Sequence, residues 1–165
     1  MAIVIDTDIL QSFAARFIQD LRESMDSSGV TASGNFNKTL KAIITPNTVV
    51  VEGARYAGAI ELGRTPTSGG GNGELRQAIR SWIDDKGITP TGKISKDSLA
   101  YIITRKIHME GTRLHQSKSG SPDFYGRSAP SRVISGVIED GRIEKLAKSV
   151  VLDVISQFRS EIFKG

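Results

Sequence analysis

The stretch from Arg142 to the C-terminus constrains the fold more than any other part of the chain. Its apolar residues recur three and four positions apart over about six helical turns, the spacing of a single buried stripe. They are Ile143, Leu146, Ala147, Val150, Val154, Phe158 and Ile162, with Val151 and Ile155 widening the stripe. A helix with so wide an apolar face has to be covered, by its own domain or by a neighbouring subunit.

A second amphipathic pattern lies near the N-terminus, where Asp8 is suited to cap a helix that runs to about Met25. Further on, LKAIITPNTVVVEGA contains two runs of β-branched residues joined at Pro46-Asn47, which predicts a hairpin over residues 40–54. The expected fold class is therefore α+β: a small antiparallel sheet with a hairpin packed against several helices, and long helices at both ends.

Two shorter helices are predicted in the middle of the chain. The first is a short amphipathic pattern from Leu75 to Ile83 that stops before Gly87 and Pro90. The second begins after Ser95, a good capping residue, and ends at Gly111.

Two segments without helical or strand periodicity are expected to be flexible loops of a single domain that spans residues 1–165. They cover about residues 64–73 and 111–131 and are polar, with several glycines and prolines. The run RVISGVIEDGR follows this loop. Its residues 132–140 fit either a strand or the first turn of a helix. Its β-branched residues favour the strand.

Composition excludes several classes of site. The 165 residues are enough for one domain with a buried core, and the absence of cysteine removes disulfides, thiolate metal sites and cysteine nucleophiles. The formal net charge of +4 is spread along the chain, which permits contact with nucleic acid without requiring it. With no signal-peptide pattern and no apolar run of membrane length, a soluble cytoplasmic protein without a membrane partner is expected.

No local pattern indicates a catalytic residue, a cofactor or a metal. The glycine-rich TSGGGNGEL lacks the lysine and hydroxyl of a phosphate-binding loop, and Glu74 occupies the start of the following helix instead. His108 and His115 have no third ligand at a recognised spacing, adjacent acids diverge on a helix, and no serine lies in a nucleophile motif. We therefore expect no enzyme; an enzyme with a dispersed active site would need a deep polar pocket.

Basic residues near the middle of the chain are the candidate for nucleic-acid contact. They are Arg105, Lys106, Arg113 and Lys118. Together they are suited to phosphate backbones, but a solvated helix face running into a loop is the simpler explanation. Because interleaved aromatic residues are missing, a basic nucleic-acid-binding protein using residues 105–118 is the alternative hypothesis.

The order of these segments resembles the head-to-tail joining and tail-completion proteins of tailed bacteriophages. The resemblance rests on TASGNFNKTLKAIIT, TVVVEGARYAGAIELGRTP, a helix carrying Trp82, AYIITRKIHMEGTR and an aromatic and proline-containing loop before the last helix. It covers about residues 9–163, and YAGAIELGRTP, which it implies to be a strand end and turn, is the best-matching motif. One departure is SPDFYGRSAPS, where the family usually has a compact Pro-Phe-Phe-x-Pro run.

The resemblance implies a non-enzymatic virion protein that assembles in the host bacterial cytoplasm. Copies would form rings of six or twelve at the head-to-tail junction, as a connector, neck or tail-terminator protein. The neighbours would be portal, connector or tail proteins, and DNA in the channel would be at most a transient contact. The expected contact residues are, between subunits, Tyr56, Glu61, Gly63 and Arg64 and, toward a partner protein, Phe124, Tyr125 and Arg127.

Overall fold

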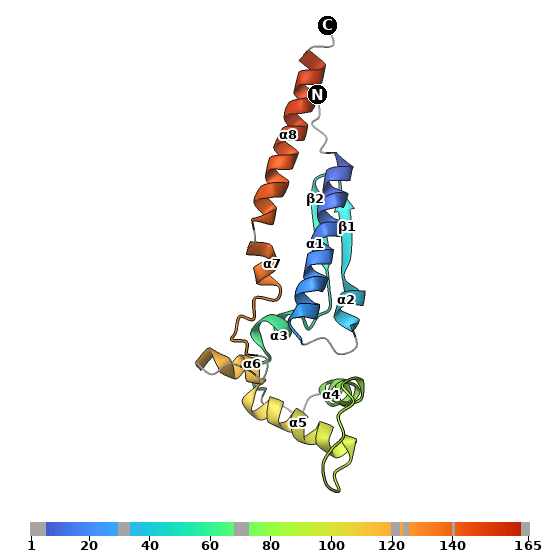
Figure 1. Cartoon of the computed structure of the whole chain (residues 1–165), viewed down its shortest axis with the longest axis vertical. Coiled ribbons are helices and arrows are strands. Elements are labelled where there is room, and N and C mark those ends of the chain that lie inside the picture. The colour runs from blue at the N-terminus through green and yellow to red at the C-terminus, as the bar shows by residue number, and fades with distance from the viewer. Residues whose placement is uncertain are drawn as a thin grey trace.

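Two long helices from the two ends of the chain form the upper part of the molecule (Figure 1). In the computed structural model, α1 spans Thr7–Ser27 and α8 spans Arg142–Ile162, which confirms both expected terminal helices. The structure describes residues 6–29, 34–67, 73–119, 123, 126–139 and 141–162. The expected cap of α1 is wrong by two positions: the side chain of Asp6 accepts a hydrogen bond from the backbone N–H of Asp8, which lies in the first turn.

The predicted hairpin is confirmed and packs against α1. Strand β1 spans Lys41–Thr45, β2 spans Thr48–Glu52, and the two pair antiparallel with Ile43 opposite Val50. Alternate side chains of both strands are half-buried where the hairpin meets α1, and the others are exposed. The fold is thus α+β, with a two-stranded sheet and long terminal helices.

The main core lies between the C-terminal half of α1 and segments from two distant parts of the chain. Helix α2 spans Asn35–Thr39 and α7 spans Ser135–Glu139. The buried members of this core are Leu21, Met25, Phe36, Leu40, Val133 and Val137. The hydroxyl of Ser24 also donates a hydrogen bond to the carbonyl of Val133, at 2.7 Å, so polar and apolar contacts join the same segments.

The lower part of the molecule is a pair of helices, as predicted (Figure 1). Helix α4 spans Glu74–Asp85 and packs on α5, which spans Lys96–Glu110. Ile83 and Ala100 are completely buried in this part. The side chain of Ser95 accepts a hydrogen bond from the Ser98 N–H and so caps α5, as its sequence predicts.

Three short helices lie where other structure was expected. YAGAIELGRTP was expected to be a strand end and turn, but Ala57–Leu62 forms helix α3. Within the expected loop 111–131, helix α6 spans Arg113–Gln116 and a 3-10 turn spans Ser117–Ser119, because the side chain of Thr112 caps α6.

The expectation of a strand within residues 132–140 is also wrong, since this run contains α7. Its β-branched residues favour a strand only when no other group fixes the backbone. Here contacts from α3, described below, fix the residues at the start of α7. None of the described helices is long and apolar enough to cross a membrane.

Candidate functional site

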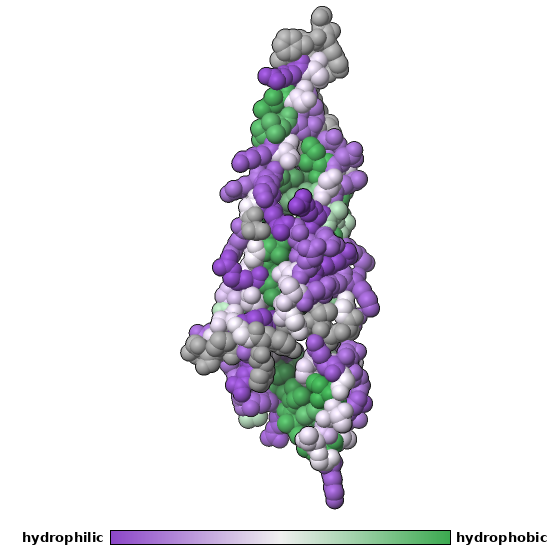
Figure 2. Space-filling view, in the orientation of Figure 1, coloured by the Kyte–Doolittle hydropathy of each residue, from purple (hydrophilic) through white to green (hydrophobic). Residues whose placement is uncertain are grey.

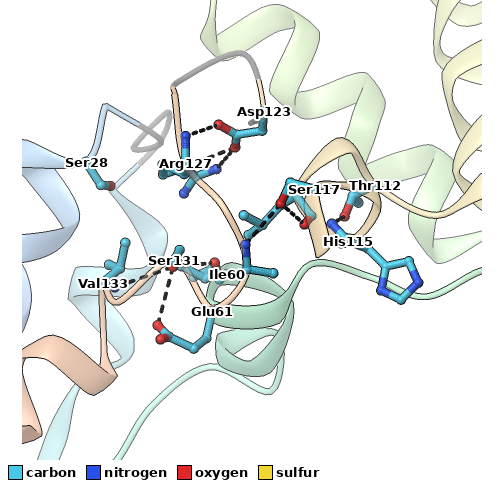
Figure 3. Close-up of polar contacts among 12 residues, drawn as sticks. Ser28, Ile60, Glu61, Thr112, His115, Ser117, Asp123, Arg127, Ser131 and Val133 are labelled. Carbon is cyan, nitrogen blue, oxygen red and sulfur yellow. Dashed lines mark hydrogen bonds and ion pairs between the residues drawn. The ribbon is translucent and has the colours of Figure 1, made fainter. Parts of the chain in front are cut away.

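Glu61 on α3 binds the segment that leads into α7 (Figure 3). Its carboxylate accepts hydrogen bonds from the backbone N–H groups of Arg132, at 3.0 Å, and Ile134, at 2.9 Å. The hydroxyl of Ser135 donates a further bond, at 2.6 Å. In addition, the backbone N–H of Ser131 donates to the Glu61 carbonyl at 2.7 Å. A single acidic residue thus satisfies donors at the start of α7 that the short helix itself leaves unpaired.

The folded structure favours the charged form of Glu61. Burial raises the pKa of the carboxyl group, but the hydrogen bonds from Ser135, Ile134 and Arg132 outweigh burial and lower the pKa below its ordinary value of 4.5. A carboxylate held ionised by several donors is a structural acceptor. The arrangement is therefore that of a joint between α3 and α7.

Gly63 ends α3 and allows the chain to approach α6 closely. Its φ angle is +74°, and a Cβ atom at this position would lie 2.3 Å from the backbone nitrogen of His115 and 2.7 Å from Thr112 Oγ1. Beyond it, the N–H of Arg64 donates to Thr112 Oγ1 at 2.9 Å, and the N–H of Thr112 donates to the Arg64 carbonyl at 2.9 Å. The first residues of the expected loop 64–73 are therefore bound to the junction of α5 and α6.

The structure brings together the four residues expected at a subunit contact, on α3 and its two ends. Tyr56 precedes α3, is 46% exposed, and lies with its ring centroid 6.2 Å from that of Phe36. Glu61 and Gly63 make the internal contacts described above, and the side chain of Arg64 is half-buried. Their role at a subunit contact stays a prediction. The sequence does not predict the joint that Glu61 forms between α3 and α7 within the chain.

Of the three residues expected at a partner surface, Phe124 and Tyr125 lie outside the described residues. Arg127 forms a part-buried ion pair with Asp123, with Nη2 2.6 Å and Nε 3.0 Å from Oδ2 (Figure 3). The Arg127 backbone N–H donates to Asp123 Oδ1 at 2.9 Å. Because only 17% of the Arg127 side chain is exposed, this residue mainly shapes its own loop. Its contact with a partner stays a prediction.

The four basic residues of the alternative hypothesis lie on three consecutive elements. Arg105 and Lys106 are on α5, Arg113 begins α6, and Lys118 is in the 3-10 turn. The Lys106 ammonium lies 3.7 Å from the carboxylate of Glu110. Lys106 and Arg113 both line a groove of about 540 Å³, together with aliphatic side chains, Trp82 and the ion-paired Asp123 and Arg127. Successive bases of single-stranded nucleic acid commonly stack on several aromatic side chains, and Trp82 is the one aromatic residue in the described lining of this groove.

The two histidines belong to the same junction. His108 Nδ1 lies 2.5 Å from Thr67 Oγ1, and the backbone N–H of Thr67 donates to the His108 carbonyl at 2.9 Å. The N–H of His115 lies 3.4 Å from its acceptor, Thr112 Oγ1. In the part of the chain that the structure describes, no group of three potential metal-ligating side chains comes together.

Two surfaces in the upper part of the molecule expose large apolar side chains. On α8, the exposed fractions are 55% for Val151, 66% for Leu152, 47% for Ile155 and 44% for Phe158. On the hairpin, Ile43 and Val50 are 47% and 44% exposed. Figure 2 shows hydrophobic residues along α8 on one face of the molecule. Contiguous exposed apolar surface of this kind is typical of protein contact sites.

Comparisons with known proteins leave the family open: the chain matches no protein-family model, no curated protein and no solved structure. Evidence for a function therefore comes from the residues themselves and from the two exposed surfaces.

Proposed function

We propose that the protein is a structural virion component that forms a homo-oligomeric ring at the head-to-tail junction of a tailed bacteriophage. In this role it is a connector, neck or tail-terminator protein, with portal, connector or tail proteins as neighbours. The proposal begins with the resemblance carried by YAGAIELGRTP and the order of the other segments. The observation that carries it furthest is the apolar face of α8, which its own chain leaves exposed.

The physical needs of a ring subunit agree with this architecture. A subunit of a closed ring requires two different surfaces, one for each neighbour. A two-stranded sheet also has no central strand, so both of its strands are edges. The protein is elongated, and its main core occupies only part of its length (Figure 1). Large apolar side chains outside this core are exposed and can contact neighbouring copies (Figure 2).

The proposed role is non-enzymatic, and it assigns no cofactor or metal. Its residues act by contact: ionised or apolar side chains bind neighbouring copies, while the joint at Glu61 holds α3 and α7 together. The expected compartment is the virion, after assembly in the host bacterial cytoplasm.

Native mass spectrometry and negative-stain electron microscopy test the proposal. We expect discrete closed rings, either from the protein alone or after addition of the portal or tail proteins encoded beside it. A chain that remains monomeric with each of those proteins would overturn the proposal. Binding to duplex DNA that weakens steeply with salt, in a chain that stays monomeric, would favour the nucleic-acid hypothesis instead.

A further inference from the structure

We propose that the outer face of α8 in one copy binds the outer face of the β1–β2 hairpin in the next copy. This inference rests on the proposed ring and identifies the two surfaces that would build it.

Helix α8 has an inner and an outer side. Leu146, Val150 and Val154 are half-buried on the inner side, toward the rest of the chain. Asp153 Oδ2 accepts a hydrogen bond from the backbone N–H of Asp6, at 3.2 Å, which places the start of α1 beside the middle of α8. Beyond this point α8 extends past α1 (Figure 1).

The outer side of α8 carries the exposed apolar residues Val151, Leu152, Ile155 and Phe158. Lys148 lies one turn before this patch, and Arg159 lies one turn beyond Ile155. The outer surface is therefore an apolar stripe with a cation near each end.

The outer face of the hairpin has a matching order of residues. Cross-strand pairing produces three rows: Lys41 opposite Glu52, Ile43 opposite Val50, and Thr45 opposite Thr48. All six residues are exposed. The apolar row thus lies between a charged row and a hydroxyl row.

The spacings of the two surfaces agree. Val50 and Glu52 are two residues apart on one face of β2, which corresponds to about 7 Å. Lys148 and Leu152, like Ile155 and Arg159, are four residues apart on α8, about 6 Å. A helix laid along β2 with an apolar residue over Val50 therefore brings a cation near Glu52. Among the described residues, Glu52, Lys148 and Arg159 form no ion pair within the chain.

A second copy is the occupant that accounts for both surfaces. The hairpin and α8 both pack on α1 by their inner sides, so their outer sides face away from the centre of their own chain. A contact between α8 helices alone would leave the hairpin row exposed and would stop at a dimer. Contact between two different surfaces repeats from copy to copy, and it closes into a ring when the rotation between neighbouring copies divides a full turn.

Charge-introducing variants test the contact. We expect Val50→Lys and Leu152→Lys each to lose the ring at concentrations where the unmodified protein assembles. The matched control is Met109→Lys on α5, where the side chain is 66% exposed and lies on neither surface, and it should assemble normally. Circular dichroism and thermal unfolding check that each variant keeps its fold.

The outcomes separate this inference from the proposed function. If the unmodified protein never assembles, the proposed function fails, and with it this inference. If the unmodified protein forms rings and Val50→Lys does too, the proposed function stands and this inference is overturned. Loss of the ring in all three variants would also overturn it, because the effect would then follow from added charge alone.

Crosslinking provides an independent measurement, because the chain contains no cysteine. In assembled rings of a Val50→Cys, Leu152→Cys double variant, a short bismaleimide should produce a covalent ladder of subunits on a denaturing gel. Each single-cysteine variant should give no ladder. Crosslinked dimers from Leu152→Cys alone would show contact between α8 helices and would overturn the inference.

Discussion

The carboxylate of Glu61 accepts a hydrogen bond from the backbone N–H of Ile134, at 2.9 Å and across 73 positions of the chain. With the bonds from Arg132 and Ser135, this contact fixes the start of α7 against α3. The first prediction concerns its loss. Glu61→Gln replaces one acceptor oxygen by a donor, so we expect the free energy of unfolding to fall by about 1–3 kcal/mol. Urea denaturation measures the change.

Glu144→Gln on the exposed side of α8 is the control for this substitution, and we expect a change within about 0.5 kcal/mol. Equal stability of Glu61→Gln and the unmodified protein would show that the joint contributes nothing.

The second prediction concerns pH. Because the pKa of Glu61 is lower in the folded protein than its ordinary value of 4.5, its ionised form stabilises the fold. This contribution is complete above about pH 4.5 and is lost as the pH falls through the folded pKa. The stability difference between the unmodified protein and Glu61→Gln should therefore shrink on acidification from pH 7 to below 4. A difference that grew on acidification would contradict this assignment.

The pKa of the Asp84 carboxyl group is also lowered, chiefly by its hydrogen bond from Lys96. It is present in both proteins, so its effect cancels in the comparison. Urea denaturation at a series of pH values provides the data.

The third prediction concerns Gly63. An alanine there would combine a positive φ angle with a Cβ atom 2.3 Å from the His115 backbone nitrogen, so the backbone of α6 would have to move. We expect Gly63→Ala to lower the free energy of unfolding by about 3 kcal/mol. Gly58→Ala, within α3 and with nothing within 4 Å of the added Cβ, should be neutral or stabilising by up to about 1 kcal/mol. Thermal unfolding distinguishes them, and similar effects of the two variants would contradict the close approach.

The fourth prediction compares two ion pairs, each between residues four positions apart. The pair of Asp123 with Arg127 is part-buried, with 4% and 17% of the side chains exposed. The pair of Lys106 with Glu110 is exposed and longer, at 3.7 Å. Double-mutant cycles with alanine should give a coupling energy of about 1–3 kcal/mol for the first pair and below about 0.5 kcal/mol for the second. Equal coupling energies would mean that burial adds nothing to the first pair.

The fifth prediction concerns Arg64 at the proposed subunit contact. Its bonds to Thr112 use backbone atoms, so Arg64→Glu should leave the unfolding temperature of the monomer nearly unchanged. Assembly should be impaired, as measured by native mass spectrometry. Arg105→Glu makes the same charge change at an exposed position of α5 and should assemble normally. Unimpaired rings of Arg64→Glu would remove this residue from the contact.

Local signals in the sequence were sufficient for the parts of the fold that local physics determines. The Pro46-Asn47 turn between β-branched runs specifies the hairpin, and Ser95 with Gly111 delimits α5. These features depend on backbone preferences and on hydrogen bonds within a few residues.

The joint could not be predicted in this way. Its donors at residues 131–135 and its acceptor at Glu61 are about 70 positions apart, and no local pattern connects them. The same distance explains why the sequence predicts a strand where α7 forms: β-branched residues favour a strand, and the carboxylate that fixes the start of α7 lies far away in the chain. The capping hydroxyl of Thr112 is a local signal for α6, but the glycine and serine residues around it are typical of a loop and favour that prediction instead.

Because α8 is the last helix in the chain, it is the last element to be synthesised. The helices α4 and α5 contact each other through residues that are close in sequence, so this pair can form early. The main core includes Val133 and Val137, so it can form against α1 only after these residues have left the ribosome. Helix α8 is synthesised after both. If α8 binds the hairpin of the next copy, a nascent chain without α8 can be bound only through its own hairpin, so it can end a growing ring but cannot extend it.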